Sequence, residues 1–582
     1  MTLPEKTRLE SLLEWGYMHN FIVPRLMRGS FKARTANSPI LVDWNKGIKL
    51  LSVGNSHIDA AWLWRKEDTR TKKINVTFDR ALLHMSLYPE FTYTQSQAVY
   101  YAWTKESYPE IWTDIKQRFE EGRWEVLGGD WVECDANMPS GESLIRQRAA
   151  EPGSGSRTIM RIGKAGERLV RYASVTTETY RHFGRMGLGA VFGSKNLKAV
   201  AISGKGHYPV TNLKEYRKLY DELYQAATKS PLMKKYHDVG TSINVNVLNG
   251  IGALPTRNVA SGKFEKAKTI SGEHLAENYL GRRLACTGCP VACIHIANLR
   301  EPYEDEPYFY KTTPVSYDHE LIFAAGSMLG IGNTEHFLKL CDAIDKVGLD
   351  VISAGVTMAW ATEAFKKGMI TEQQTAGIKP EWGDHLAYML MAKNIVDQPN
   401  EFYQDIAKGV YFASRKYGGK EFAMTFGKNE MAGYHTGPAG YIGFSIGTRH
   451  SHLDNAGYSV DKKTLMEKQV PPETVVDQLV KEEKSRQIIS SLTACFFARA
   501  MYTPEIISRA LKLSGLDVTT ADLDRIGGEI YRNKFAFKFR EGFTIDPSEL
   551  PKRIYETPSP VTYLSEEYVK KALDRFAQLI KE

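Results

Sequence analysis

The chain has few cysteines, no long apolar run and no concentrated basic segment. Its six cysteines are too few and too unevenly placed for a disulfide framework, and no signal peptide precedes them, which together predict a reducing cytoplasm. No stretch of about eighteen or more apolar residues occurs, so we expect no membrane span. The formal net charge of +8 is spread along the chain, without a Lys/Arg block interleaved with aromatics, which argues against a nucleic-acid partner.

The cysteines that are present are gathered at one place. Cys286, Cys289 and Cys293 follow a Cys-x2-Cys-x3-Cys spacing, and Cys495 comes about two hundred residues later. A loop of this spacing wraps three thiolates around one face of a [4Fe–4S] cluster, and a distant segment supplies the fourth. Spacing alone leaves two alternatives open: a zinc site, which usually shows two Cys-x2-Cys knuckles, and a set of unconnected buried thiols such as Cys341.

Length and composition indicate a globular protein. The chain has 582 residues, of which 42% are hydrophobic and 25% charged, and this length indicates roughly three or four domains. A Pro-Gly-Ser-Gly-Ser stretch at 152–156 is typical of a linker. Before it, alternating strand and helix patterns predict the start of a parallel α/β fold. The expected strands cover 47–53, 91–95 and 124–127, and the expected helices cover 71–87 and 108–121.

Candidate metal ligands follow the first and the last of these strands. His57 and Asp59 come directly after the first strand, and Asp135 follows the last. Ligand sites of parallel α/β folds gather at the carboxyl ends of the strands, and two residues that are two apart in an extended segment point to the same side. One imidazole and two carboxylates make a half-site for zinc or another divalent metal. His-x-Asp alone, however, more often marks an ordinary surface or core histidine.

Four short segments of this region carry a family resemblance. They are Gly54–Trp64, Thr94–Gln97, Gly128–Asp135 and Pro139–Ser143. In them, residues 1 to about 147 resemble the amino-terminal part of the zinc-dependent retaining α-mannosidases, glycoside hydrolase family 38. The resemblance implies His57 and Asp59 as zinc ligands and Asp135 as both ligand and nucleophile, acting on mannosides. The family's further histidine ligand and its acid/base carboxylate would lie beyond this region, where the sequence shows neither.

A second set of motifs begins after the linker. They are Ile162–Glu167 and the glycine-dense run Gly184–Ala199. The glycines, with Arg185 and Lys195, suit the approach of backbone amides and a guanidinium to a phosphate, although a generic glycine-rich turn explains them equally well. From about Ile159 to the carboxyl end, the chain resembles the tungsten-pterin aldehyde:ferredoxin oxidoreductases. The resemblance implies that Arg185 faces the pterin phosphates.

The same resemblance covers two pterin-binding turns. The first is Asp345–Asp350, which ends an expected helix. The resemblance implies that Asp345, Gly348 and Leu349 contact a tungstopterin or molybdopterin, whereas an ordinary Gly-capped helix end would explain the glycine but not the flanking aspartates. The second turn leads to the fourth cysteine and has serine where aspartate is usual. We therefore expect a weakened pterin contact there, at Ala494.

The resemblance also implies the catalytic residues. Glu320 aligns with the glutamate that lies near the metal in this family and would take a proton from, or orient, the hydrated aldehyde. Asp318 is close enough in sequence to be mistaken for it. A histidine of the following Arg-His-Ser-His motif would donate a hydrogen bond to the carbonyl oxygen, and we favour His452 over His450. Electrons would pass through the cluster to ferredoxin.

Together these features predict a fusion of two incomplete enzymes. The fold is expected to be an α/β fragment, the start of a parallel α/β barrel, fused to a mostly α-helical two-domain oxidoreductase region with a residual piece of its β-rich base domain. Roughly one hundred and fifty residues that begin the base in the oxidoreductase family are absent, and the mannosidase-like piece takes their place. The expected divisions are 1–147, a linker at 148–158, the base remnant at 159–210, and helical domains at 211–425 and 426–582.

Three functions follow from this organisation. The first is a tungsten or molybdenum aldehyde oxidoreductase, for which the family implies ferredoxin as partner and a homodimer. The second is a zinc-dependent α-mannosidase. The third is a non-catalytic iron–sulfur protein, which would bind the cluster but no pterin.

Overall fold

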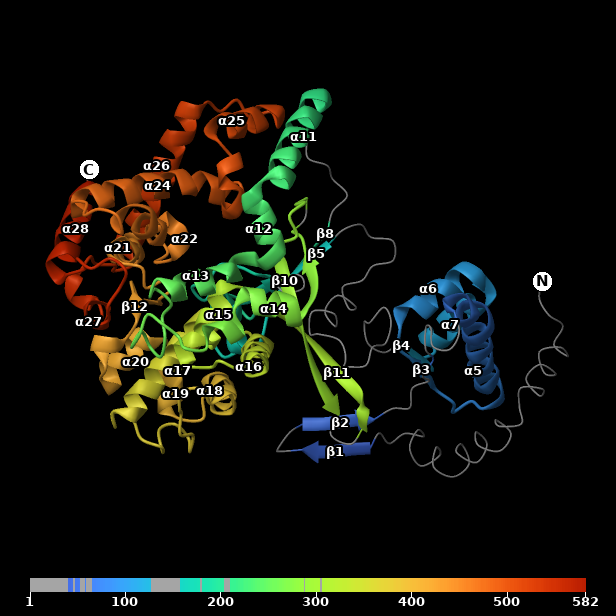
Figure 1. Cartoon of the computed structure of the whole chain (residues 1–582). Coiled ribbons are helices and arrows are strands. Elements are labelled where there is room, and N and C mark those ends of the chain that lie inside the picture. The colour runs from blue at the N-terminus through green and yellow to red at the C-terminus, as the bar shows by residue number, and fades with distance from the viewer. Residues whose placement is uncertain are drawn as a thin grey trace. The chain divides into compact units, whose positions relative to one another are not determined.

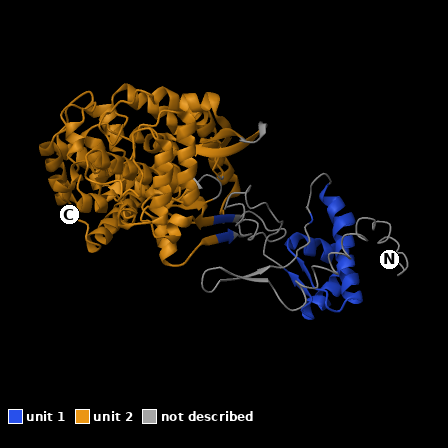
Figure 2. Ribbon diagram, turned by 90° about the horizontal axis from the view of Figure 1, so that it is seen from below, with its two compact units in different colours: residues 1–159, 201–205 blue, residues 160–200, 206–582 orange. Residues whose placement is uncertain are grey.

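The computed structural model describes residues 40–44, 48–52, 58, 65–126, 157–177, 181–203, 210–286, 288–303 and 306–581. The chain divides into two compact units (Figure 1, Figure 2). The first comprises 1–159 with 201–205, and the second comprises 160–200 with 206–582. The two units are described separately.

The first unit contains a short parallel α/β motif. Strands β3 (Tyr93–Gln95) and β4 (Trp124–Val126) pair in parallel, and α6 (Ala98–Ser107) and α7 (Pro109–Glu120) connect them. This agrees with the α/β pattern expected from the sequence, except that α6 was not predicted. The expected helix at 71–87 forms as a π-helical segment, η2 (Thr69–Ile74), followed by α5 (Asn75–Leu87). A single helical turn, α4 (Lys66–Asp68), precedes it.

One strand of this unit pairs differently from the prediction. The strand expected at 47–53 forms as β2 (Ile48–Ser52), but it pairs antiparallel with β1 (Ile40–Trp44). A short connection favours this arrangement, because closing a small loop between two neighbouring strands costs little entropy, whereas a parallel partner needs a crossover. The expected role of this strand as the first of a parallel sheet is therefore not confirmed.

An aromatic cluster forms the core of the α/β motif. The indole of Trp124 packs edge-on against Phe78 at 5.3 Å and against Tyr93 at 4.5 Å between ring centroids. Its Nε1 donates a 3.1 Å hydrogen bond to the hydroxyl of Tyr101. Because each buried ring removes a large apolar area from water, this cluster binds α5, α6 and the two strands together.

A four-stranded sheet in the order β7-β6-β5-β8 lies at the boundary of the units, because residues 157–159 of β5 and 201–203 of β8 are assigned to the first unit. Strand β6 pairs antiparallel with both β5 and β7. The elements of this part are β5 (Arg157–Ile162), α9 (Lys164–Glu167), β6 (Val175–Thr177), β7 (Arg181–His182), α10 (Leu188–Ser194) and β8 (Ala199–Ser203).

Glycines in this part allow close backbone packing. A Cβ on Gly163 would lie 2.8 Å from the Cα of Gly348, and a Cβ on Gly348 would meet Gly163 at the same distance. A Cβ on Gly166 would lie 2.8 Å from the carbonyl oxygen of Gly189, and a Cβ on Gly189 would lie 2.5 Å from the carbonyl oxygen of Ser174. Contact of this kind leaves no room for a side chain, so steric packing accounts for these glycines without any ligand.

The remainder of the second unit is mostly helical. Its strands form an antiparallel sheet in the order β11-β10-β9 and a short β12–β13 pair. The strands are β9 (Leu280–Leu284), β10 (Ile294–Tyr303), β11 (Glu306–Tyr317), β12 (Thr425–Phe426) and β13 (Asn429–Glu430). The helices up to β12 are α11 (Leu213–Lys229), α12 (Pro231–Val239), α13 (Asn244–Gly250), α14 (Gly272–Asn278), α15 (His319–Ala325), α16 (Thr334–Val347), α17 (Val351–Lys366), α18 (His385–Asp397), α19 (Glu401–Ile406) and α20 (Val410–Tyr417).

A second helical group follows β13, and in it α24 packs against both α26 and α28 (Figure 1). These helices are α21 (Pro438–Ile446), α22 (His452–Asn455), α23 (Gly457–Val460), α24 (Pro472–Ser491), α25 (Pro504–Leu513), α26 (Thr520–Arg540), α27 (Arg553–Glu556) and α28 (Glu566–Leu579). The 3-10 and π-helical turns of this unit are η3 (Gly240–Ile243), η4 (Ala267–Ile270), η5 (Ser327–Leu329), η6 (Lys420–Phe422), η7 (Asp461–Leu465), η8 (Phe496–Met501) and η9 (Pro547–Glu549).

Helix α17 lies at the centre of the larger core. It is buried along nearly its whole length, which is the pattern of a helix enclosed on every side rather than an amphipathic surface helix. Asp350 caps its amino terminus by accepting hydrogen bonds from the backbone N–H groups of Ile352 and Ser353. The core around α17 includes Ala165, Val170 and Tyr172 of the base remnant, so the remnant and the helices share one core.

Replacement of Gly348 tests the close approach of the two glycines. Gly348 ends α16 with φ of 82°, whereas Gly368 ends α17 with φ of 71° and has no neighbouring atom within 4 Å of an added Cβ. Both Gly368→Ala and Gly348→Ala should lower the free energy of unfolding by about 1 kcal/mol, because alanine is strained in the left-handed backbone conformation. Gly348→Ala should lower the free energy of unfolding further, because the added Cβ also collides with the backbone of Gly163. The measurement is the apparent unfolding temperature of each variant at one scan rate. Equal decreases for the two variants would show that the added Cβ at Gly348 is accommodated without a steric penalty.

Candidate functional site

The first three candidate cluster cysteines lie on one loop. Cys286 and Cys289 belong to the connection between β9 and β10, and Cys293 directly precedes β10. The backbone N–H of Cys289 donates to the carbonyl oxygen of Cys286 at 3.0 Å. The N–H of Val291 points at the Cys289 sulfur at 3.5 Å. An N–H directed at sulfur stabilises a thiolate, which is the form that binds iron.

The fourth cysteine follows the end of α24. Cys495 immediately precedes η8. Burial raises the pKa of Tyr502, and the charges of Cys495 and Cys289 add to that effect. Burial likewise raises the pKa of Tyr236, which also lies within range of the charges of Cys495 and Cys293. Cys495 and the loop cysteines thus act electrostatically on the same two tyrosines, and their convergence on one cluster stays a prediction.

The chemistry of this donor set fits an iron–sulfur cluster. Cys286 and Cys495 are exposed, Cys289 and Cys293 are half-buried, and none of the five described cysteines is in a disulfide. Cys341 lies apart, buried within α16. Among the residues that the structure describes, no three His, Cys, Asp or Glu side chains group closely enough to hold a single metal ion.

Glu320 and His452 face each other in the interior of the unit. Asp318, the nearby acidic residue, caps α15 by accepting a hydrogen bond from the N–H of Leu321 at 3.1 Å, so its role is structural. Glu320, in the first turn of α15, accepts the N–H of Gly433 through Oε2 at 2.9 Å. Its other oxygen, Oε1, lies 3.5 Å from Nε2 of His452, and the two side chains are only 13% and 12% exposed.

Burial sets the protonation of this pair. It raises the pKa of Glu320 to about 8, against the lowering effect of the Gly433 hydrogen bond. It lowers the pKa of His452 to about 3, and the nearby His319 and Arg185 charges lower it further. At neutral pH the carboxyl group is therefore mostly protonated and the imidazole neutral. Among the residues that the structure describes, neither Oε1 of Glu320 nor Nδ1 of His452 has a hydrogen-bond partner.

Two neighbours of this pair were not singled out from the sequence. Nε2 of His319 lies 3.0 Å from the carbonyl oxygen of Gly433, and burial lowers the His319 pKa to about 4. His319 and Glu320 thus hold the two ends of the Gly433 residue. The ring of Tyr434 packs against His319 and His452 at 5.0 and 5.2 Å between centroids and stacks on Tyr458 at 4.2 Å. The adjacency of His319 to Glu320 was a signal that sequence reasoning overlooked.

The expected pterin residues occupy a turn that joins the base remnant to the helical core. His182 Nε2 contacts Asp345 Oδ1 at 2.7 Å. Leu349 forms a bridge with Ala173, and the N–H of Ser174 donates to the carbonyl oxygen of Gly348 at 2.9 Å. These contacts hold the Asp345–Asp350 turn against β6 and its preceding loop.

Arg185 is engaged by protein groups. Its Nε donates to Asp350 at 2.7 Å, its Nη2 to Ser353 at 2.8 Å, and its Nη1 to the carbonyl oxygen of Glu430 at 3.0 Å. A guanidinium carries five N–H donors, so two of them have no hydrogen-bond partner among the described residues. Its expected contact with pterin phosphates stays a prediction. Ala494 lies after the end of α24, where its N–H donates to the carbonyl oxygen of Ile489 at 3.0 Å.

The expected zinc residues His57, Asp59 and Asp135 lie outside the described residues.

Comparison with protein families assigns most of the chain. Residues 218–582 match the model of aldehyde ferredoxin oxidoreductase domains 2 and 3, and residues 137–204 match the model of the amino-terminal domain of that enzyme. Residues 47–150 match the model of the amino-terminal domain of glycosyl hydrolases family 38. The chain therefore combines parts of two enzyme families, as the sequence motifs predicted.

Relatives of the larger part are enzymes of the first family. The tungsten-containing aldehyde ferredoxin oxidoreductase of Pyrococcus furiosus is 30% identical over 439 residues, covering 72% of this chain and 69% of that protein. The enzyme of the same name from Thermococcus kodakarensis is 31% identical over 470 residues, covering 77% and 74%. The chain belongs to the aldehyde ferredoxin oxidoreductase family. It is an oxidoreductase of that type.

The smaller part and the fold give two further comparisons. Alpha-mannosidase G of Dictyostelium discoideum is 48% identical over 99 residues, which are 17% of this chain and 9% of that protein. The active-site complex BamBC of benzoyl coenzyme A reductase, solved with 1,5-dienoyl-CoA, aligns with a TM-score of 0.58 at 19% identity over 75% of this chain and 72% of that chain, which shows a shared fold. Within the described residues, no helix is long and apolar enough to cross a membrane.

The shifted pKa of Glu320 predicts a pH-dependent stability. Glu320 in the unfolded chain loses its proton near pH 4, but the folded protein keeps it to about pH 8. The stability that this group contributes is therefore complete below pH 4 and is lost as pH rises to about 8, because the folded state then binds more protons than the unfolded state. Denaturation midpoints of Glu320→Gln should fall less steeply over this range than those of Glu567→Gln, a change at an exposed carboxylate of α28. If the denaturation midpoints of the two variants change with pH in parallel, Glu320 is not protonated in the folded protein at neutral pH.

Proposed function

We propose that the protein oxidises aldehydes to carboxylic acids and passes the electrons to ferredoxin. The observation that carries this proposal is the buried Glu320–His452 pair. The charges of Arg185 and Asp350 act on Glu320, which connects the pair to the turn where the family resemblance expects the pterin. A buried carboxyl group whose pKa is about 8, beside a neutral imidazole, suits the binding of a hydrated aldehyde and, once the carboxyl group has lost its proton, the deprotonation of that aldehyde.

Each member of the pair has a distinct part. His452 presents Nε2 toward Glu320, so Nδ1 is the ring nitrogen left to donate a hydrogen bond to the carbonyl oxygen of the substrate. Glu320, once deprotonated, takes a proton through Oε1 from the hydrated aldehyde. Gly433, held by His319 and Glu320, fixes the carboxyl group in place. The aromatic wall of Tyr434 and Tyr458 keeps bulk water from the pair.

The cofactors follow from the family and from the donor sets of this chain. Asp345, Gly348 and Leu349, with Arg185 and Ala494, would hold a tungstopterin or molybdopterin, and the four cysteines would hold a [4Fe–4S] cluster. When bound, these groups supply the two-electron acceptor for the aldehyde and the route for single electrons to ferredoxin.

A second candidate function belongs to the amino-terminal part. The match of residues 47–150 to a family 38 domain supports zinc-dependent α-mannosidase activity, with His57 and Asp59 as ligands and Asp135 as ligand and nucleophile. It is the weaker candidate, because the match to alpha-mannosidase G covers only 9% of that protein. A homodimer, a cytoplasmic location and the domain boundaries expected from the sequence stay predictions.

Elemental analysis of the purified protein separates these possibilities. The proposed function predicts tungsten or molybdenum together with about four irons per chain. Cys495→Ala should lower the iron content and bleach the cluster's visible absorption, whereas Cys341→Ala, which removes a buried thiol away from the loop, should leave both unchanged. Iron without tungsten or molybdenum would indicate a non-catalytic iron–sulfur protein. Zinc together with hydrolysis of an aryl mannoside would support the mannosidase.

Glu320→Gln tests the catalytic assignment. Loss of a positioned acid/base group should lower the rate of aldehyde-dependent acceptor reduction by about 10²–10⁴-fold, while the tungsten and iron contents stay as in the parent protein. The parent rate should rise with pH toward about 8, as the carboxyl group loses its proton. Glu335→Gln, at an exposed position in the first turn of α16, is the control. A Glu320→Gln enzyme that keeps its metals and its rate would exclude this role.

A further inference from the structure

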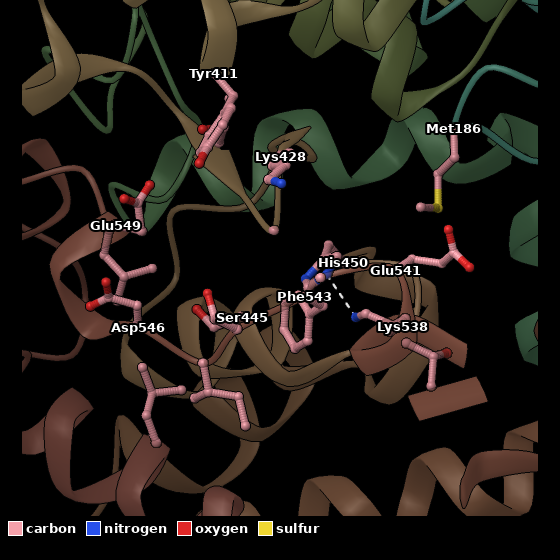
Figure 3. A pocket seen from close by; sticks show the side chains of 18 of the residues that line it. Met186, Tyr411, Lys428, Ser445, His450, Lys538, Glu541, Phe543, Asp546 and Glu549 are labelled. Carbon is pink, nitrogen blue, oxygen red and sulfur yellow. Dashed lines mark hydrogen bonds between the residues drawn. The ribbon is translucent and has the colours of Figure 1, made fainter. Parts of the chain in front are cut away.

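The two histidines of the Arg-His-Ser-His motif belong to different sites. His452 faces Glu320, whereas His450 lines a cavity of about 450 Å³ (Figure 3). The walls of this cavity come from the β12–β13 turn, from α20, α21, α26 and α28, from the segment that follows α26, and from Met186. It lies entirely within the second unit. Of the functional residues favoured from the sequence, those that the structure describes do not line it.

His450 and Lys538 form a hydrogen-bonded pair at the wall of this cavity. His450 is only 3% exposed. Its Nδ1 lies 2.9 Å from the carbonyl oxygen of Phe444, which accepts but cannot donate, so Nδ1 carries the proton. The unprotonated Nε2 then accepts from the ammonium of Lys538, at 2.8 Å (Figure 3). The imidazole therefore presents a lone pair, a proton acceptor, to the lysine.

The surrounding backbone is shaped around this pair. Gly427, with φ of 54°, lies directly against the imidazole edge, and any Cβ there would overlap Nε2 of His450. Lys538 also contacts the carbonyl oxygen of Gly447 at 3.3 Å, and its ammonium lies 3.9 Å from the ring centre of Phe543. These contacts hold the amine at one place on the cavity wall instead of letting it extend into solvent.

Burial alters the protonation of both groups. It lowers the pKa of Lys538 to about 8, although the carboxylates of Glu483 and Asp454 act in the opposite direction. It lowers the pKa of His450 to about 3, with the charge of Lys538 adding to the effect. A lysine held in such surroundings has far more free amine at neutral pH than an exposed one, and the free amine is the nucleophile.

The rest of the cavity favours a neutral ligand. Three carboxylates line it, those of Glu541, Asp546 and Glu549 (Figure 3), and they would repel an anion. Glu549 pairs with Arg415, and Glu541 pairs with Arg540 at 3.2 Å. Apolar side chains cover much of the remaining wall: Phe537, Phe543, Ile545, Leu550 and Leu573. An uncharged carbonyl compound with an apolar substituent suits this lining.

We propose that Lys538 captures aldehydes covalently, its ε-amine adding to the carbonyl carbon to form an imine inside this cavity. Nε2 of His450 first takes a proton from the ammonium. The free amine then forms a C–N bond as the C=O π bond breaks, and one proton passes from the nitrogen to the oxygen. The proton held by His450 then adds to this hydroxyl group, which leaves as water. The product is a protonated imine, and no oxidant or reductant is consumed.

This inference is independent of the proposed oxidation, because imine formation needs neither metal nor pterin. The test treats the purified full-length chain with benzaldehyde and sodium cyanoborohydride, which reduces an imine to a stable secondary amine, and locates the adduct by peptide mass spectrometry. Lys428 of the same cavity is exposed and serves as the internal comparison. At neutral pH, Lys538 should be labelled roughly a hundredfold faster than Lys428.

Variants identify the groups involved. Lys538→Arg should abolish the fast adduct, and Lys428→Arg should leave it. His450→Gln should slow labelling of Lys538 by about a hundredfold through loss of the proton acceptor. Labelling of Lys538 no faster than that of Lys428 in the unaltered protein would overturn the proposal, as would a fast adduct that persists in Lys538→Arg. Aldehyde-dependent reduction of an acceptor, measured separately, reports on the oxidation and not on this site.

Discussion

The close contact between Gly163 and Gly348 is the constraint on which the arrangement of the second unit depends. Each glycine leaves no space for a Cβ on the other, so the loop after β5 and the end of α16 meet backbone to backbone. The left-handed conformation of Gly348 ends α16 and directs the chain toward Asp350, which caps α17. One turn thus sets the position of the base remnant, the direction of the most buried helix and, through Asp350, the orientation of Arg185.

Burial then determines the chemistry on either side of that framework. The Glu320–His452 pair lacks a charge at neutral pH because desolvation disfavours both charged forms. The Lys538–His450 pair keeps a shared proton, since the imidazole lone pair faces the ammonium. Two histidines separated by a single residue therefore contact different partners. The backbone between them accounts for the divergence: His450 has φ of 54°, and His452 begins a new helix behind the cap of Ser451.

The sequence predicted local features better than partnerships. The end of α16 at Gly348, the parallel strands around 91–95 and 124–127, and the two family resemblances are properties of short segments, and each is found. The antiparallel partner of β2 was missed, because periodicity indicates a strand without indicating its neighbour. Gly433, the hydrogen-bond partner of Glu320, lies 113 residues further along the chain, and Lys538, the partner of His450, lies 88 residues further along. Such pairs arise only from tertiary packing, so no residue spacing in the sequence predicts them.

The base remnant shows how a partial domain is retained. Residues 164–172 hold it to the helical body: Lys164 pairs with Asp397 at 2.5 Å, the N–H of Arg171 donates to Ala407, and the Tyr172 hydroxyl donates to Ile406. All these contacts are made by residues after the linker. Large apolar side chains of residues 181–200 are exposed, namely Phe183, Met186, Val191 and Leu197, but Met186 also lines the cavity beside His450. Single exposed apolar residues are ordinary on a protein surface. The family model of the amino-terminal domain matches only 137–204, so the contacts with the helical body, among the described residues, are what hold the remnant in place.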